Sequence, residues 1–341
     1  MTTREPDRAE KCWAVPHGRV VYVVRRRRWP WLILFGLAVI IVLLLLGSRK
    51  KSARTGWTDL RERELYGGGE NKVAVIRLGG FFEDGNEGIS DSARSQVRDF
   101  SSALRKARED EAVKAVVVEV NSPGGSATAS DIMWRRLCEF KECRKPVVAL
   151  LGDIAASGGY YVIAPADLIL AHPTTITGSI GVIIMNFNVE GLMAKLGIRD
   201  VTIKAGEHKD ILSPFREMSP EERADIQAIA DGLLDRFITV VAEGRGLDSA
   251  AARALADGSV YTAARAIELG LVDRTGYLED AATAAGELAG ISDPKVVEYA
   301  PPPTFLSLIG ISTPPGIDMV SRGLGSFARL SGTRALYLWN P

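Results

Sequence analysis

The sequence predicts an α/β fold in which a mostly parallel β-sheet is connected by βαβ crossovers. Short β-branched runs alternate with longer amphipathic stretches from residue 72 onward, which is the pattern of this fold class. The run VKAVVVEV at 113–120 is almost entirely apolar, as in a parallel strand that is buried on both faces. Glycine-rich clusters directly follow several runs, and active sites of such sheets lie at those strand ends. The pattern therefore favours an enzyme.

The individual elements follow from the spacing of apolar residues along the chain. We expect strands at 72–78, 113–120, 146–152, 167–172, 181–186 and 200–206, and another near Val296. We expect helices at 92–108, 127–140, 189–196, 219–243 and 280–289, and a glycine-interrupted helix that begins at Ser157. The helix at 219–243 opens with SPEE, in which a serine N-cap precedes proline at the first helical position. Residues 257–276 are expected to form a turn, a short helix and a second turn.

Composition excludes some classes of protein. Lys+Arg and Asp+Glu are both 42, so the formal net charge of zero gives no reason to expect a nucleic-acid partner. Three cysteines are too few for a disulfide scaffold. Cys138 and Cys143 are compatible either with a local disulfide or with free thiols. Neither an HExxH motif nor a paired Cys/His spacing occurs, so we expect no metal and no cofactor.

Residues 29–47 are expected to form a transmembrane helix. The stretch from Trp31 to Gly47 carries no charge and is flanked by Arg25–Arg28 and by Arg49, Lys50 and Lys51. A cleaved signal peptide is the alternative, but the polar segment before the apolar run is long, and no small-x-small cleavage site follows directly. The interpretation is a single-pass protein of the cell membrane that contacts lipid through residues 29–47.

The orientation of this anchor is predicted from the lengths of the segments on its two sides. Six Lys/Arg lie in residues 11–28 and six in residues 48–67, so the positive-inside comparison is balanced. A short basic tail, residues 1–28, is expected to stay in the cytoplasm, while a long domain translocates. Beyond the anchor we expect a polar linker at 48–71, a catalytic domain at 72–300 outside the cytoplasm, and a Pro/Gly-rich C-terminal tail at 301–341.

Two glycine-rich motifs follow strands and precede helices. In Asn121-Ser-Pro-Gly-Gly-Ser126, two glycines permit a bend whose backbone N–H groups can converge on one point, as in an oxyanion hole. In Ala155-Ala-Ser157-Gly-Gly-Tyr-Tyr161, a serine with small neighbours lies at a strand-to-helix turn, as a nucleophile does. Taken alone, the first motif could equally form an ordinary βα turn. The serine of the second motif, taken alone, would be an N-cap residue.

Two further motifs offer partners for a nucleophilic serine. Thr177-Gly-Ser179-Ile-Gly181 lies between two expected strands and by itself predicts a turn. Lys204-Ala-Gly-Glu-His208-Lys209-Asp210 contains candidate bases, and a lysine serves as a base when burial lowers its pKa. His17 precedes the membrane segment and is excluded on that ground, whereas His208 and Lys204 stay open as alternatives to Lys209.

Together, the ordered motifs SPGG, ASGGYY, TGSIGV, GEHKD and SPFREMSPEE resemble those of the signal peptide peptidase A (SppA) family. The resemblance covers roughly residues 72–290. Ser157, Ser179 and Lys209 follow one another at spacings similar to those of single-repeat members. The resemblance implies a Clp protease/crotonase-like fold, homo-oligomers in which neighbouring subunits complete the site, and no cofactor.

The resemblance also implies a role for each site residue. Ser157 would be the nucleophile and Lys209 its general base, and Ser179 would orient the lysine. Backbone amides of Gly124 or Gly125 and of Gly158 would hold the oxyanion. The expected function is a membrane-anchored serine endopeptidase that cleaves apolar peptides such as remnant signal peptides. The alternatives are a crotonase-type acyl-CoA enzyme and a non-catalytic membrane scaffold on the same fold.

Overall fold

The computed structural model describes residues 60–83, 96–300 and 335–339. The expected basic tail and anchor, and all of the C-terminal tail but its last strand, lie outside these residues. In the described part of the chain, no helix has both the length and the apolar character needed to cross a membrane. All elements below belong to one compact unit, residues 57–341.

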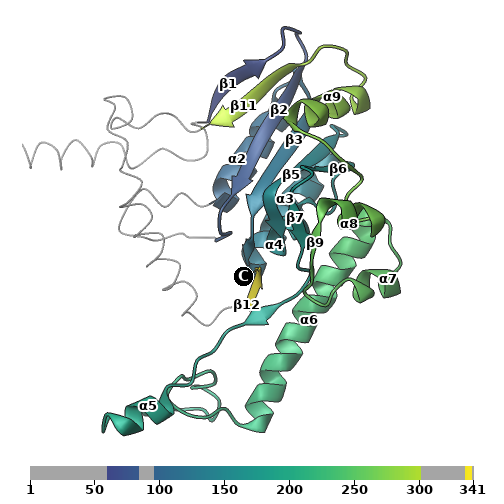
Figure 1. Cartoon of the computed structure of the whole chain (residues 1–341). Coiled ribbons are helices and arrows are strands. Elements are labelled where there is room, and N and C mark those ends of the chain that lie inside the picture. Colours follow the sequence, from purple (N-terminus) through teal and green to yellow (C-terminus); the bar gives the residue numbers. More distant parts are fainter. Residues whose placement is uncertain (1–59, 84–95, 301–334, 340–341) are drawn as a thin grey trace, which may run out of the picture. The chain divides into compact units, whose positions relative to one another are not determined.

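The described strands form two sheets, and the larger one has nine strands (Figure 1). It contains β1 (Arg61–Tyr66), β2 (Lys72–Gly79), β3 (Val113–Ser122), β5 (Val147–Ala156), β6 (Leu168–Ala171), β7 (Ile176–Gly178), β9 (Val260–Thr262), β10 (Arg274–Thr275) and β11 (Lys295–Ala300). The order is β1-β11-β2-β3-β5-β6-β10, and β7 pairs with both β5 and β9. Only β1 and β9 run antiparallel to their neighbours in this described sheet. The smaller sheet has the order β4 (Gly124–Ser126), β12 (Ala335–Leu338) and β8 (Ile183–Ile184).

Helices cover both faces of the larger sheet. The helices of the described residues, not all of which contact this sheet, are α2 (Gln96–Glu109), α3 (Ala127–Lys141), α4 (Gly158–Ile163), α5 (Glu190–Lys195), α6 (Pro220–Arg245), α7 (Ser249–Ala254), α8 (Ala263–Glu268) and α9 (Leu278–Leu288). Alternate residues of β2 point to opposite faces, so Ala74 and Ile76 pack in the core with α2, α3 and α4, while Val73 and Val75 pack with α9. Figure 1 shows α9 and α2 on opposite faces of the sheet. The predicted α/β class with a mostly parallel sheet is confirmed.

Most predicted elements are present, but four segments differ from the prediction. Residues 61–66, assigned to a linker, form edge strand β1, whose mostly charged sequence does not indicate its pairing with β11. Residues 335–338, assigned to an irregular tail, form β12. The strand expected at 200–206 is absent from this described segment, because Val201 and Ile203 are 84% and 97% exposed and have no partner strand. Of the run at 181–186, only Ile183–Ile184 is a strand.

Candidate active site

Ser157 occupies a sharp turn between β5 and α4. Its backbone has φ 52° and ψ −119°, a conformation that residues with a side chain rarely adopt. The Ser157 amide donates to the Gly178 carbonyl at 2.8 Å, and its own carbonyl accepts from the Tyr161 amide at 2.9 Å. Its Oγ is buried and has no hydrogen-bond partner among the described residues. Ser157 makes no side-chain cap hydrogen bond to α4, and a strained turn with an unpaired buried hydroxyl is consistent with the predicted nucleophile.

Ser179 lies beside Ser157 because two parallel strands end together. In the register of β5 and β7, Ala156 is opposite Gly178, and the two serines follow directly. Ser179 is buried and also has a positive φ, 51°, and its amide donates to the Ser259 carbonyl at 2.7 Å. The structure therefore brings together two serines that belong to separate sequence motifs.

The glycines of the SPGG turn lie against the start of α4. A Cβ built on Gly124 would lie 2.6 Å from the Gly158 amide nitrogen, so the two backbones meet at the site of the serine. Gly158 is the first residue of α4, where amides have no acceptor within the helix. The Gly124 amide instead donates to Ser122 Oγ at 3.0 Å. Of the three predicted oxyanion donors, the Gly124 amide is thus already paired, and Gly125 and Gly158 stay as candidates.

Two residues that the sequence did not single out shape this turn. Ser122 Oγ accepts from the Gly124 amide and donates to the Gly80 carbonyl at 2.6 Å. The Phe82 amide donates to the Gly124 carbonyl, and the Phe82 carbonyl accepts from the Ser126 amide, each at 2.8 Å. These bonds hold the glycines from the side of β2. The position of Ser122 in the NSPGG motif was a signal, whereas nothing around Phe82 indicated its role.

Lys209 lies on an exposed segment far along the chain from this cluster. Residues 185–219 connect β8 to α6, and Figure 1 draws α5 beside the N-terminal end of α6, away from the nine-stranded sheet. Lys209 and Lys204 are both exposed, and His208 Nδ1 lies 4.0 Å from Glu222 Oε1. The described residues of one chain therefore do not bring Lys209 onto the Ser157 hydroxyl.

An ion-pair cluster fixes the loop that carries Lys209. Arg216 donates to Asp210 at 2.8 Å and to Glu222 at 2.8 Å, and Lys204 pairs with Asp210 at 2.6 Å. Glu222 also accepts from the Ser219 amide, which completes the capping box of α6. Arg216 holds the pKa of Asp210 well below its usual range and that of Glu222 at about 2. The quoted motif SPFREMSPEE thus has a structural role, since it clamps the neighbour of Lys209 to a helix end.

The ion pairs of Arg216 with Asp210 and Glu222 predict that the stability of this loop depends on pH. Carboxylates with lowered pKa values stabilise the fold above their ordinary pKa, and that stabilisation is lost as pH falls through the lowered values. We expect Arg216→Ala to speed hydrogen–deuterium exchange in residues 204–216 at pH 7. After correction for intrinsic exchange rates, the difference in exchange rate between Arg216→Ala and wild type should shrink as pH falls from about 4.5 toward about 2. A difference that persists unchanged at pH 3 would show that the ion pairs do not order the loop.

The two cysteines near the end of α3 are free. Cys143 donates to the Phe140 carbonyl at 2.8 Å, and burial raises the pKa of the Cys138 thiol. A disulfide between them, one of the two arrangements left open above, is not formed.

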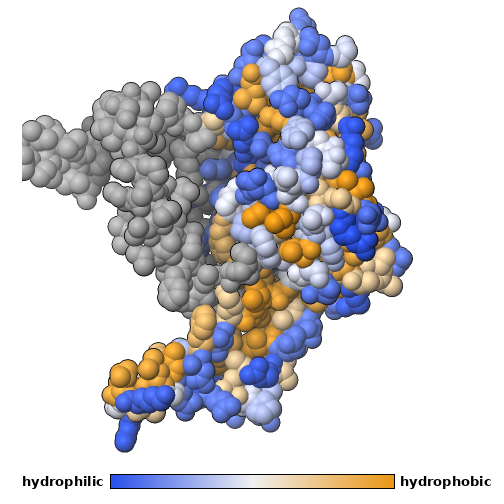
Figure 2. Space-filling model, viewed as in Figure 1, coloured by the Kyte–Doolittle hydropathy of each residue, from blue (hydrophilic) through white to orange (hydrophobic). Residues whose placement is uncertain are grey.

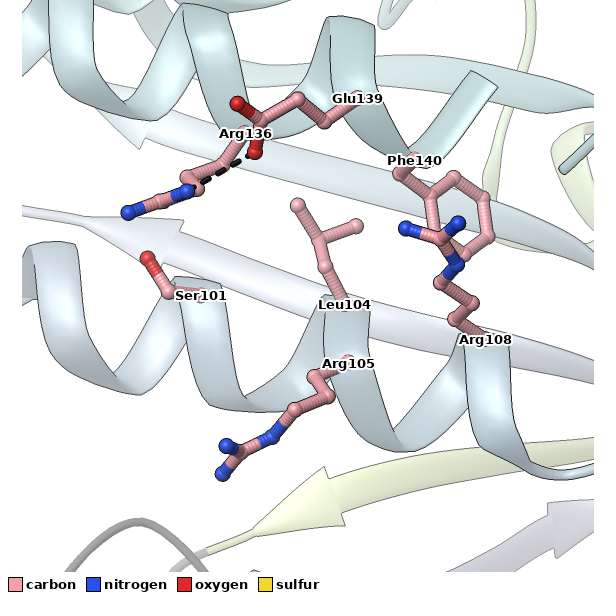
Figure 3. A pocket seen from close by; sticks show the side chains of 7 residues that line it. All are labelled: Ser101, Leu104, Arg105, Arg108, Arg136, Glu139 and Phe140. Atoms are coloured by element: carbon pink, nitrogen blue, oxygen red, sulfur yellow. Dashed lines mark hydrogen bonds and ion pairs between the residues drawn. The ribbon is translucent and has the colours of Figure 1, made fainter. Parts of the chain in front are cut away.

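A separate hollow of about 290 Å³ lies between α2 and α3 (Figure 3). Leu104 and Phe140 contribute apolar side chains, and three arginines and Glu139 surround them. Glu139 already accepts from Arg136 at 2.8 Å. None of the predicted site residues lines this hollow, so it is distinct from the serine cluster.

Known proteins with related sequences include several that are named as peptidases or proteases. The model of peptidase family S49 matches residues 139–292, which contain Ser157, Ser179 and Lys209. A protein of Enterococcus faecium that bears the name signal peptide peptidase SppA is 38% identical over 81% of this chain and 85% of its own length. A protein of Methanocaldococcus jannaschii named as a protease is 40% identical over 69% of this chain and 76% of its own. A protease-named protein of Synechocystis is 43% identical over 56% of this chain and 69% of its own.

An α/β fold that carries a serine on a strained strand-to-helix turn is typical of serine hydrolases, and the family match and the protease-named relatives identify a serine peptidase. The chain belongs to the SppA family of serine peptidases.

Proposed function

We propose that the chain is a membrane-anchored endopeptidase that cleaves apolar peptides with a Ser157–Lys209 pair tuned by Ser179. The observation that carries the proposal is the buried, unpaired Ser157 hydroxyl on its strained turn. Residues 29–47 anchor the chain in the membrane and leave the catalytic domain outside the cytoplasm, where remnant signal peptides are a source of apolar substrate.

The mechanism assigns one step to each residue. Neutral Lys209 takes the proton from Ser157 Oγ, which attacks the peptide carbonyl. The amides of Gly125 and Gly158 hold the oxyanion. Lys209 then protonates the departing amine, and water attacks the acyl-enzyme to release the second product. Ser179, next to Ser157 in the strand register, orients the lysine amine.

We propose further that Lys209 comes from a neighbouring copy in a homo-oligomer. Within one chain, Lys209 is exposed and the Ser157 hydroxyl lacks a partner among the described residues. The segment that carries Lys209 also exposes large apolar side chains, and Figure 2 shows hydrophobic surface gathered over α5. The exposed large apolar residues are Ile183 at the end of β8 and, in residues 185–219, Phe187, Leu192, Leu196, Ile198, Val201, Ile203 and Phe215. Such a surface is typical of a protein–protein interface, and a second copy that covers it would also bury the lysine side chain.

A fluorophosphonate probe tests the nucleophile directly. We expect it to label wild-type protein at Ser157, as located by peptide mass spectrometry, and to leave Ser157→Ala unlabelled. Ser126→Ala, which changes the N-cap serine of α3, is the matched control and should still be labelled. Absence of labelling in wild type, together with no hydrolysis of any peptide, would favour the non-catalytic scaffold.

A further inference from the structure

The helix that follows the candidate nucleophile is too weak to maintain its own geometry. α4 has only six residues, Gly158–Ile163, and it begins with two glycines. Glycine disfavours the helix, and a helix this short is not stable alone. Ser157 makes no side-chain cap hydrogen bond to α4, and its positive φ costs free energy. The surroundings of α4 must therefore maintain the strained turn and the direction of the Gly158 amide.

Two adjacent tyrosines connect α4 to other parts of the fold. Tyr160 and Tyr161 are both fully buried. Successive residues of a helix point about 100° apart, so the two rings leave α4 in different directions. The Tyr160 hydroxyl donates to the Leu271 carbonyl, between α8 and β10, at 2.7 Å. The Tyr161 hydroxyl donates to Asp131 Oδ1 of α3 at 2.5 Å. The two bonds therefore tether α4 from two sides.

The acceptor of the Tyr161 hydroxyl is itself held in place. Arg236 of α6 donates to Asp131 Oδ1 from two of its nitrogens, at 3.3 and 3.2 Å. Cζ of the same arginine lies 4.4 Å from the centroid of the Trp134 ring, which limits its movement. Burial raises the pKa of both phenols, Tyr160 and Tyr161, so both hydroxyls stay protonated donors at neutral pH. Asp131 therefore offers Tyr161 a fixed acceptor between α3 and α6.

The backbone of α4 joins these tethers to the serine. The Tyr161 amide donates to the Ser157 carbonyl at 2.9 Å, so the residue that binds Asp131 also closes the first turn after the nucleophile. α4 packs so closely on α3 that a Cβ built on Gly158 would overlap Ser130 Oγ. The direction of the Gly158 amide therefore follows the position of α4 as a whole.

We propose that the hydroxyls of Tyr160 and Tyr161, the latter through Asp131, are positioning groups that hold α4 in the orientation that catalysis by Ser157 requires. This inference rests on the proposed peptidase function, to which it adds residues that act without touching the reacting atoms. The tethers fix α4, and α4 fixes the turn of the nucleophile and the Gly158 amide. Because an oxyanion hole depends on donors that are already in place, loss of a tether should slow the chemical step rather than weaken substrate binding.

Steady-state kinetics on a generic apolar peptide separate positioning from simple stabilisation. Tyr160→Phe and Tyr161→Phe each remove one hydroxyl and keep the ring. We expect kcat, corrected for the folded fraction, to fall about tenfold in each, while KM changes less than about twofold. Tyr299→Phe is the matched control and should keep the wild-type kcat, because the Tyr299 hydroxyl is buried but has no partner among the described residues. A lower Tm with unchanged kcat in both α4 variants would overturn the positioning role.

Substitutions at Asp131 test the bond to Tyr161 itself. Asp131→Asn keeps an oxygen acceptor and should retain kcat within about threefold of wild type, whereas Asp131→Ala removes the acceptor and should be about tenfold slower. Addition of Tyr161→Phe to Asp131→Ala should cause no further loss, because both changes break the same bond. Additive losses of the two changes, or an Asp131→Asn variant as slow as Asp131→Ala, would show that this bond does not position α4.

Hydrogen–deuterium exchange tests the tethers without any need for activity. Loss of either the Tyr160 or the Tyr161 hydroxyl should speed exchange of the α4 amides about tenfold relative to Tyr299→Phe, because α4 opens locally more often. If no protein cleaves peptide but exchange responds in this way, the peptidase proposal fails and the tethers stand. If wild type cleaves peptide and neither kcat nor exchange changes in the α4 variants, the positioning inference fails alone.

Discussion

Alanine at either Ser157 or Lys209 is expected to lower kcat/KM for peptide hydrolysis by about a thousandfold or more, because the serine and its base act as one unit. KM should change little, since neither side chain is needed to pair with the peptide backbone. Initial rates on a generic apolar peptide would measure both effects. The free energy of unfolding should be nearly unchanged for Lys209→Ala, whose side chain is exposed.

The same loop offers matched controls for the lysine. Lys204→Ala removes an equal charge that pairs with Asp210 at 2.6 Å, and His208→Ala removes the other candidate base. Each should retain activity within about tenfold of wild type, because each only supports the loop. Full activity in Lys209→Ala together with an inactive His208→Ala would assign the base to histidine instead.

Co-expression of the two inactive variants tests whether the pair forms across subunits. In a randomly mixed homo-oligomer, about a quarter of the sites would combine an intact Ser157 from one copy with an intact Lys209 from its neighbour. Recovery of about that share of wild-type activity is the expected result. A mixture as inactive as its components, in a protein shown to be oligomeric, would mean that each chain uses its own lysine.

The sequence predicted the fold well where burial leaves a local pattern. The apolar runs of β2 and β3 and the spacing of α2 are properties of short segments, and these elements form as expected. β1 could not be found this way, because its residues are mostly charged and pair with β11 through contacts such as Arg63 with Glu298, 235 positions away. Pairing between such distant segments has no signature within either one.

The candidate site follows the same rule: its local motifs could be predicted from the sequence, and its long-range contacts could not. Ser157 and Ser179 were named from their motifs, and the parallel pairing of β5 and β7 explains why they meet. Arg216 stood within a quoted motif, yet its clamp on Asp210 and Glu222 is visible only in three dimensions. Tyr337 packs against Tyr161 and Phe237 from strand β12. The two partners of this strand, β4 and β8, both lie far earlier in the chain, so no local pattern indicated the place of Tyr337.

Gly124→Ala is expected to remove activity by a different route, through the backbone. Gly124 has φ +100°, which a residue with a Cβ adopts only with strain. The added Cβ would overlap the Tyr337 carbonyl oxygen and lie 2.6 Å from the Gly158 amide nitrogen, so it would fill the space beside a proposed oxyanion donor. We expect kcat/KM to fall by about a hundredfold or more, with a stability cost of about 1–3 kcal/mol.

A matched glycine elsewhere distinguishes this local effect from a general cost of alanine. Gly232 lies in the middle of α6, and a Cβ built there meets nothing within 4 Å. Gly232→Ala should leave kcat/KM unchanged and raise stability by about 0.5–1 kcal/mol, because alanine restricts the unfolded chain and favours the helix. Thermal unfolding and initial rates on both variants make the comparison. If Gly124→Ala turned over peptide as fast as Gly232→Ala, the SPGG turn would have no part in holding the oxyanion, and the donors would have to be sought at the start of α4 alone.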